Sequence, residues 1–350
     1  MQLLYSNTKP CEYDSSSFSE AFENGVVGSD IIKIATGYIT EDSLLELKSI
    51  LLFYFEEKQT KTCSLVIGMH GREGFTRAQY DAAIELATFL RENGLGSVRV
   101  CTAFKYHGKT YVFGKNGVPA PVSAMLGSSN LGNILDSRQY EVDALFTEGS
   151  VLTELDSLHE DLVKKASRDI LDMPKPEHFV EMTDLLQDRV DVEKADQDVY
   201  EAIEATGVER VFDIPLKTEA KSNLNAYFGK GRLATATGAI RPRHWYEVEL
   251  IVPREITEAD GYPPRDTQIS VITDDGWKFE CKIQGDYGKN FRSGGDLKTL
   301  GRWIKGRLER ANCLKVGQPV TDEVLQKYGR KTISLKETSD PKVWLLDFSV

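Results

Sequence analysis

Residues 106–114 read "YHGKTYVFG", and residues 127–130 read "GSSN". The first stretch alternates polar and apolar residues, which is typical of a β-strand, and side chains two apart in a strand point to the same face. His107 and Lys109 are therefore expected to project together. Two cations on one face repel each other, so the pair indicates a bound anion or an imidazole that stays neutral. A neutral imidazole beside a cation that binds phosphate is a nucleophile directed at phosphorus.

The turn that follows supplies further groups suited to a phosphate. Ser128 and Asn130 offer a hydroxyl and an amide, and a tight turn exposes backbone N–H groups to phosphate oxygens. Glu141 lies in "QYEVDALF", where the alternation places it on the same strand face as Asp143. A carboxylate there can orient an imidazole or hold its proton. Each piece alone is typical of a solvated strand or a simple turn, whereas the set in this order favours a phosphodiester site.

The length and charge of the chain indicate two halves with different tasks. A chain of 350 residues fits two domains better than one. Residues 1–200 carry 19 Lys and Arg against 32 Asp and Glu, whereas residues 201–350 carry 24 against 22. This asymmetry indicates different partners for the two halves. The second half is not strongly basic, so a nucleic-acid contact there has to be a local cluster.

Several classes of protein and site are not expected. The five cysteines are scattered, which disfavours a disulfide framework and indicates a reducing, cytoplasmic location. No apolar run approaches the roughly 18 residues that cross a bilayer, so no membrane partner is expected. The N-terminus lacks the pattern of a signal peptide. No set of Asp, Glu and His has the spacing of metal ligands, so neither a metal nor another cofactor is expected.

The first half predicts an α/β domain with a mixed sheet covered by helices. Strands are expected within 30–39, 63–69 and 96–104, and amphipathic helices over 40–57 and 76–93. Strands separated by helices predict parallel pairing. After residue 104, strand-like stretches follow one another through short loops, so this part of the sheet is expected to be a meander.

The second half predicts a small β-barrel-like domain closed by a helix. Residues 150–200 are acidic and are expected to be largely helical, with Pro174 and Pro176 marking a connector. The predicted division is a nuclease-like domain at 1–180, a linker at 181–205 and a second domain at 206–350. Strands are expected within these ranges: 246–253, 267–273, 278–283, 331–337 and 343–349. A helix over 296–312 packs Trp303, Ile304 and Leu308 on the barrel, with its Lys and Arg on a solvated face.

The order H-x-K, then G-S-x-N, resembles the motif of the phospholipase D superfamily. The matching positions are His107, Lys109, Gly127, Ser128 and Asn130. The Asp that usually follows the Lys by five residues is replaced by Gly114, a departure that disfavours an ordinary lipase or kinase. The chain is more similar to the metal-independent restriction endonucleases of this superfamily, of the BfiI and NgoFVII type. In that family a Glu follows the Asn on the next strand, and Glu141 fits its place.

The resemblance implies a mechanism. His107 attacks the scissile phosphorus and forms a phosphohistidine, a second His protonates the leaving oxygen, and water resolves the intermediate. Lys109, Asn130 and Ser128 bind the phosphate, and Glu141 holds the imidazole. Since the other histidines (His70, His159, His178 and His244) lack a Lys two residues on, the second His is expected from another copy of the chain in a homodimer. His70, in "GMHGREG", is expected to be a polar turn residue.

Two basic loops of the second half predict a DNA contact. Residues 217–243 and 282–296 carry basic and amide side chains with interleaved tyrosines, and they resemble the two arms of the B3-like DNA-binding domains found in this endonuclease family. The candidates for contact with double-stranded DNA are Lys221, Asn223, Asn225, Lys230, Arg232, Arg241, Arg243, Lys282, Tyr287, Lys289, Asn290 and Arg292. Each loop alone is more typical of a solvated surface connection, whereas the nuclease-like motif beside them favours a contact with DNA.

Two other functions stay open at this point. A phosphodiesterase of the same superfamily would act on a lipid or another small phosphodiester, although no apolar stretch for membrane docking accompanies the motif. A DNA-binding protein with an inactive nuclease fold would keep the arms and lose the chemistry. The arms favour a site-specific restriction endonuclease; the sequence it reads and any partner protein of a restriction system cannot be deduced.

Overall fold

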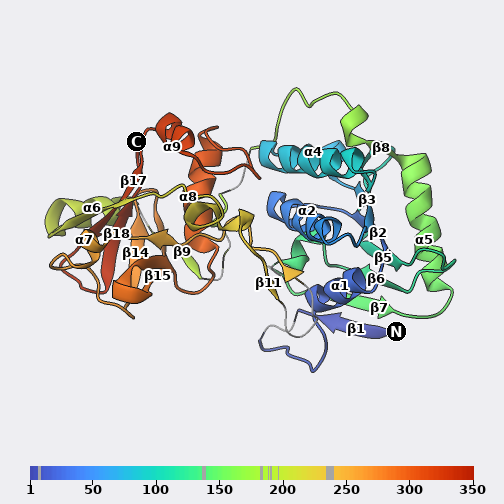
Figure 1. Ribbon diagram of the computed structural model, residues 1–350, viewed down its shortest axis with the longest axis horizontal. Helices are drawn as coiled ribbons and strands as arrows, with labels where there is room; N and C mark the ends of the chain where they lie inside the picture. The colour runs from blue at the N-terminus through green and yellow to red at the C-terminus, as the bar shows by residue number, and fades with distance from the viewer. Residues whose placement is uncertain are drawn as a thin grey trace. The chain divides into compact units, whose positions relative to one another are not determined.

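The computed structural model describes residues 1–6, 9–135, 139–181, 184–187, 189, 191–195, 197–233 and 240–350. The chain forms two compact units, each with its own sheet (Figure 1). The first unit contains residues 1–182 together with 231–242, and the second contains residues 183–230 together with 243–350.

The first unit is built on an eight-stranded mixed sheet in the order β1-β7-β6-β5-β2-β3-β4-β8. Its strands are β1 (Gln2–Tyr5), β2 (Ile31–Thr36), β3 (Thr62–Ile67), β4 (Gly96–Cys101), β5 (Thr110–Gly114), β6 (Ser123–Gly127), β7 (Val142–Phe146) and β8 (Ser167–Asp169). Strands β2, β3 and β4 are parallel neighbours. Strands β5, β6 and β7 form an antiparallel meander that joins β2. Both the parallel part and the meander were predicted from the sequence.

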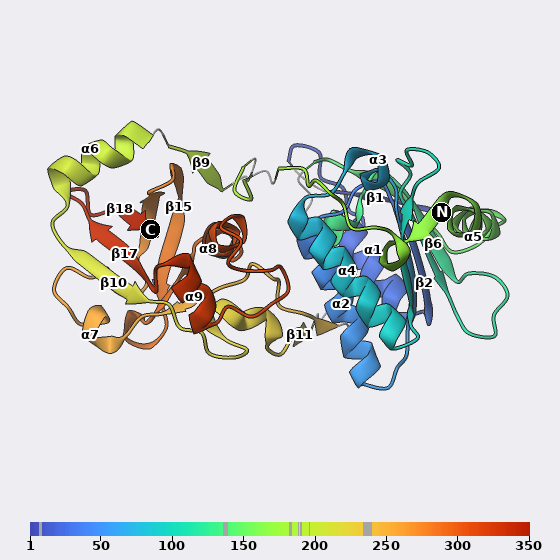
Figure 2. The same ribbon diagram turned by 90° about the horizontal axis from the view of Figure 1, so that it is seen from above.

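Helices cover both faces of this sheet (Figures 1 and 2). One face carries α1, α2 and α4, and α5 lies on the other. The helices and helical turns of the unit are α1 (Phe18–Val27), α2 (Glu41–Glu56), α3 (His70–Glu73), α4 (Arg77–Glu92), α5 (Val151–Asp161), η1 (Leu131–Ile134), η2 (Leu162–Ala166) and η3 (Ile170–Asp172). Capping explains why α2 and α4 begin where predicted, because the hydroxyls of Thr40 and Thr76 accept from the N–H groups three residues on.

The second unit is built on a sheet that curls into a half-barrel. Its order is β10-β17-β18-β14-β15-β16-β13, with β9 added to β15. The strands are β9 (Val192–Lys194), β10 (Val211–Pro215), β13 (Leu250–Ile251), β14 (Gln268–Thr273), β15 (Trp277–Gln284), β16 (Asn290–Ser293), β17 (Thr332–Glu337) and β18 (Val343–Asp347). The fold class predicted for the second half, a β-barrel-like domain with one closing helix, is therefore confirmed in outline.

Short helices surround this sheet. They are α6 (Gln197–Gly207), α7 (Arg254–Thr257), α8 (Thr299–Arg310), α9 (Asp322–Tyr328), η4 (Asn223–Phe228) and η5 (Asp286–Gly288). A two-stranded ribbon, β11 (Arg232–Leu233) with β12 (Ile240–Arg241), completes the described elements.

Two predicted elements of the second unit differ from the structure. Residues 192–194 lie in the stretch expected to be helical, yet they form β9, because their backbone pairs with β15 from Trp277 to Phe279. The strand expected over 246–253 shortens to β13, since Trp245, Tyr246 and Val248 are buried in the core while a turn joins Glu247 N–H to His244. Tertiary contacts override the local pattern in both cases.

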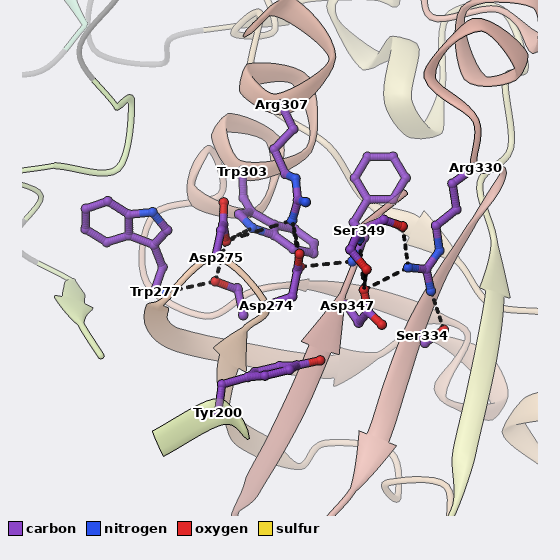
Figure 3. Close-up of polar contacts among 12 residues, drawn as sticks. Tyr200, Asp274, Asp275, Trp277, Trp303, Arg307, Arg330, Ser334, Asp347 and Ser349 are labelled. Carbon is purple, nitrogen blue, oxygen red and sulfur yellow. Dashed lines mark hydrogen bonds and ion pairs between the residues drawn. The ribbon is translucent and has the colours of Figure 1, made fainter. Parts of the chain in front are cut away.

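Charged pairs fasten α8 to the half-barrel sheet (Figure 3). Arg307 donates from Nη1 to the two carboxylate oxygens of Asp274, at 2.6 and 2.8 Å, and Trp303 donates from Nε1 to Asp275 at 2.8 Å. Two further cations of α8, Arg302 and Lys305, are almost fully buried. The prediction of a solvated Lys and Arg face on this helix is therefore wrong for them. The helical periodicity of the sequence predicted which apolar residues of α8 face the core. It could not predict the polar partners that allow Arg302 and Lys305 to be buried there as well.

Lys305 is the most deeply buried cation of the helix. Its ammonium donates to the carbonyl of Trp245 and lies 4.0 Å from the centroid of the Trp245 ring. Burial lowers the pKa of Lys305 from 10.5 to about 7, and the nearby charge of Glu309 only partly opposes this. The folded protein therefore holds a lysine that is easier to deprotonate than the same lysine in the unfolded chain.

This gives a pH-dependent stability. Between pH 7 and pH 10.5 the unfolded state binds a proton that the folded state releases, so the free energy of unfolding should rise with pH across this window and level off below pH 7. Urea unfolding of the wild type and of Lys305→Met checks this. From pH 7 to pH 9.5, the free energy of unfolding of the wild type should rise by on the order of 2–3 kcal/mol more than that of Lys305→Met. A difference between the two proteins that does not change with pH would contradict the assignment.

Candidate active site

The H-x-K residues lie in the segment that leads into β5 and not within the strand. This corrects the expected position, because β5 begins at Thr110. The physical reason is a close crossing: a Cβ at Gly68, just after β3, would lie 1.9 Å from the carbonyl oxygen of Tyr106. The chain thus passes over the end of β3 before it can join the sheet, and it places His107 and Lys109 at that end.

His107 and Lys109 form a close couple. The Lys109 ammonium nitrogen lies 3.1 Å from Nε2 and 3.2 Å from Nδ1 of His107, and it donates to the His107 carbonyl at 2.7 Å. The imidazole is exposed, whereas Lys109 is buried to 5% exposure. Burial lowers the pKa of Lys109, and the charge of Glu141 counteracts it.

Residues at and just after the end of β2 orient the side chain of Asn130. Its Oδ1 accepts from the N–H of Tyr38 at 3.0 Å and lies 3.3 Å from the hydroxyl of Thr36. This fixes the carbonyl end of the side chain and leaves the NH₂ end as the donor. A Cβ at Gly37 would lie 3.2 Å from His107 Cδ2 and 3.5 Å from Asn130 Oδ1. Gly37 therefore lets the imidazole and the amide approach each other.

The two serines of the turn have different roles. Ser128 is exposed, and its hydroxyl accepts from the N–H of Val142 in β7 at 3.0 Å. Ser129 is fully buried and donates from Oγ to Asp143 at 2.6 Å and from its N–H at 3.0 Å. The carboxylate of Asp143 thus holds the turn in place from β7. A Cβ at Gly127 would lie 2.1 Å from the same carboxylate, so the first position of the turn requires glycine.

Glu141 lies one residue before β7 and is buried. Its backbone is held by Ser6: the Glu141 N–H donates to Ser6 Oγ at 2.8 Å, and the Ser6 N–H donates to the Glu141 carbonyl at 3.2 Å. The carboxylate is near enough to Lys109 to raise that lysine's pKa against the effect of burial. In the described geometry, Glu141 therefore acts on the Lys109 ammonium, and not on the imidazole as the resemblance implied.

Sequence reasoning missed the residues that follow β2. Thr36, Gly37 and Tyr38 contact Asn130 or His107, and none was a candidate. A signal was present in "TGYIT", since small and polar residues at the carboxyl end of a parallel strand often border a site. His70 is buried with both ring nitrogens engaged, by the Gly74 carbonyl and the Ile39 N–H, so it is part of the packing and not a solvated turn residue.

Two family models match the chain. A model described as the NgoFVII restriction endonuclease N-terminal PLD (phospholipase D) domain matches residues 17–172. A model described as the NgoFVII C-terminal B3-like DNA-binding domain matches residues 202–339. The two models follow each other along the chain in the order that their descriptions give. The chain belongs to the NgoFVII family of restriction endonucleases. It therefore has a nuclease domain of the phospholipase D superfamily and a B3-like domain that binds DNA, as the sequence predicted.

Distant likenesses to solved structures accompany this match. Nuc, a phospholipase D family member from Salmonella typhimurium, is 16% identical with a TM-score of 0.33, over 48% of this chain and 95% of Nuc. NucT from Helicobacter pylori is 11% identical with a TM-score of 0.29, over 47% of this chain and 98% of NucT. Phosphatidylserine synthase from Haemophilus influenzae is 13% identical with a TM-score of 0.34, over 49% of this chain and 41% of the synthase. A search of curated proteins found no match.

Within the described ranges, no helix is both long and apolar enough to cross a membrane. Among the same residues, no group of three or more His, Cys, Asp or Glu side chains is arranged to hold a metal ion.

The B3-like domain presents its second basic segment on a hairpin. Lys282 of β15 lies opposite Arg292 of β16, and Asn290 lies opposite Gln284, so these side chains share one partly exposed face. Between the strands, Tyr287 is 65% exposed, in a left-handed conformation with φ of 59°. The guanidinium of Arg254, which was not a candidate, lies 4.6 Å from the centroid of the Tyr287 ring. Lys289 is partly exposed near Asp286, at 3.6 Å.

The first basic segment is less uniform. Lys221 and Lys230 are exposed, whereas Asn223 donates to Glu219 at 2.6 Å and Arg243 pairs with Glu247. Asn225 is buried, and both ends of its amide bind the backbone of Val320, at 2.8 and 2.9 Å. That geometry gives Asn225 a structural role and leaves no free edge for a base. The side chains of Arg232 and Arg241 lie outside the described part of the structure.

The lowered pKa of Lys109 predicts an alkaline limit for DNA cleavage. If phosphate binding needs the ammonium, kcat/KM should fall at a pH below 10.5, the value of an unperturbed lysine. In Lys109→Arg the side chain stays charged up to pH 10.5, so its kcat/KM should not fall at alkaline pH. The altered geometry should still lower its rate at pH 7 by roughly 10–100-fold. Single-turnover cleavage measured from pH 7 to pH 10.5 checks this. The same limb in both proteins would assign it to another group.

Proposed function

We propose that the chain is a metal-independent, site-specific type II endonuclease that cuts double-stranded DNA through a phosphohistidine at His107. One observation carries the proposal: an exposed imidazole has a buried ammonium 3.1 Å from its Nε2 nitrogen, while the oriented amide of Asn130 lies across Gly37. Such a cluster offers a nucleophile and two donors for the oxygens of one phosphate.

The residues divide the chemistry between them. A ring nitrogen of His107 forms a bond to phosphorus while the bond to the leaving oxygen breaks, and the Lys109 ammonium and the Asn130 NH₂ bind the non-bridging oxygens as charge gathers on them. A second imidazolium gives its proton to the leaving oxygen. The resulting neutral imidazole then takes a proton from water, which attacks phosphorus and releases His107. Glu141 keeps Lys109 charged despite its burial.

The second imidazole comes from a second copy of the chain. His70 cannot serve, because it is buried, both of its nitrogens are engaged and burial lowers its pKa. His159 is also buried, with a pKa lowered to about 4, so neither ring carries a proton to give near neutral pH. In the proposed homodimer, two-fold symmetry brings two copies of His107, Lys109, Asn130 and Glu141 to one scissile phosphate.

The B3-like domain would direct the cut. We propose that the β15–β16 hairpin contacts bases or phosphates through Lys282, Tyr287, Lys289, Asn290 and Arg292. Exposed Lys221 and Lys230, with Asn223 and Arg243, would form the second arm. Ser128 stays a candidate for the phosphate site, since its exposed position adjoins the buried Ser129. The assignment of Arg232 and Arg241 to the same arm stays a prediction from the sequence.

Cleavage in a chelator tests the chemistry. Plasmid DNA incubated with the protein in excess EDTA should yield fragments with discrete ends, and His107→Ala should lower the rate by at least about a thousandfold because no other group replaces the nucleophile. His178→Ala is a matched control, since His178 is exposed and is not among the site residues. Cleavage by His107→Ala at the wild-type rate would refute the proposal, and so would a strict requirement for a divalent cation.

Mixing subunits tests the shared site. Wild type and His107→Ala are unfolded together, refolded at different ratios and assayed at constant total protein. If each cut needs two intact copies of His107, activity should fall as the square of the wild-type fraction. A linear fall would instead show that each copy cuts alone, and the composite site would have to be abandoned.

A further inference from the structure

The turn from β2 to α2 contacts several parts of the candidate site at once. Gly37 lies between His107 and Asn130, and the backbone N–H of Tyr38 holds the Asn130 carbonyl at 3.0 Å. The next residue, Ile39, donates its N–H to His70 at 3.4 Å, and its carbonyl accepts from Gln79 at 3.1 Å. The turn is therefore fixed along its whole length, and the side chain of Tyr38 extends from a rigid base.

The ring of Tyr38 makes edge contacts with two imidazoles. Its centroid is 5.7 Å from that of His107, with an interplanar angle of 78°, and 5.6 Å from that of His70, at 88°. Edge-to-face contacts at this separation are the arrangement that aromatic quadrupoles favour. His107 is exposed, so among the described contacts this ring and the Lys109 ammonium restrict its rotation most directly.

The hydroxyl end of Tyr38 is held as well. It donates to Glu73 at 2.9 Å, and the other oxygen of that carboxylate accepts from Lys105 at 3.0 Å. The bond to Glu73 raises the pKa of Tyr38, so the phenol stays protonated. All three side chains lie at the surface, where such bonds contribute little energy. The ring contacts are thus the stronger candidate for a functional role.

His70, which contacts Tyr38, is itself packed against a row of aromatic rings. His70 stacks on Phe75 with centroids 4.9 Å apart, Phe75 meets Tyr80 at 6.0 Å, and Tyr80 meets Phe179 at 5.6 Å. These are packed interior groups for the most part, since His70, Phe75 and Tyr80 are buried. Tyr38 therefore contacts a firmly packed neighbour, His70, as well as the exposed imidazole of His107.

We propose that Tyr38 is a positioning residue for His107. It holds the imidazole in the one orientation that directs a ring nitrogen toward the phosphate bound by Lys109 and Asn130. This inference rests on the proposed function, in which His107 is the nucleophile. A nucleophile on an exposed side chain loses rate when it samples several rotamers, and a fixed near-attack geometry removes that loss.

Variants at position 38 separate the ring from the hydroxyl. Tyr38→Leu removes the ring and should lower the single-turnover cleavage rate by roughly 10–100-fold. Its affinity for DNA should change by less than about twofold, because the groups that bind phosphate remain. Tyr38→Phe keeps the ring and should restore most of the rate. Phe55→Leu, which removes an aromatic pair between α2 and α4 away from the site, is the matched control and should cut as the wild type does.

Two outcomes at this position would overturn the inference. Cleavage by Tyr38→Leu at the wild-type rate is the first. The second is cleavage by Tyr38→Phe as slow as that by Tyr38→Leu, which would assign the effect to the bond with Glu73. If the leucine variant does not fold, the wild-type protein still decides. Nuclear Overhauser effects between the ring protons of Tyr38 and His107 are expected in a sample labelled at Tyr and His, and their absence would overturn the contact.

Comparison with His107→Ala keeps the two proposals apart. An inactive His107→Ala with a fully active Tyr38→Leu would leave the nucleophile in place and remove only the positioning role. An active His107→Ala would remove the nucleophile, whatever the position 38 variants do.

Discussion

The site depends on an ammonium that is buried beneath an exposed imidazole. Burial disfavours the charge on Lys109, and two groups oppose this effect: the charge of Glu141 and the His107 carbonyl, which accepts from the ammonium. The result is a cation that stays fixed without a flexible, solvated side chain. That cation adjoins the His107 ring, since its nitrogen lies 3.1 Å from Nε2.

Close backbone approaches bring this pair to the remaining groups. A Cβ at Gly68 or Gly127 would lie 1.9 or 2.1 Å from an oxygen of a neighbouring segment, so only glycine permits these approaches, and a Cβ at Gly37 would lie 3.2 Å from His107. The buried contact of Ser129 with Asp143 then fixes the turn that carries Asn130. The nuclease domain thus uses strand ends and turns, supported by a packed sheet, to hold its polar groups.

Much of the first domain could be predicted from the sequence, because its signals are local. The helices α2 and α4 have capping hydroxyls and clear apolar periodicity, and the motif residues follow one another in order. The contributions of Thr36 and Tyr38 could not be predicted in this way, since they act through a strand end that only the sheet order brings beside β5. The burial of Lys305 and Asn225 was hidden for a similar reason: their partners, Trp245 and Val320, lie far away in the chain.

The fastening of the segment after Pro176 has a practical consequence. Val180 donates its N–H to the Phe75 carbonyl at 2.8 Å, and it forms a β-bridge with Thr76. The last residues before the B3-like domain are thus part of the framework of the first unit. A different DNA-binding domain should therefore be fused to this nuclease domain after residue 181. A junction nearer to Pro176 would remove the β-bridge and the hydrogen bond that Val180 makes with the nuclease domain.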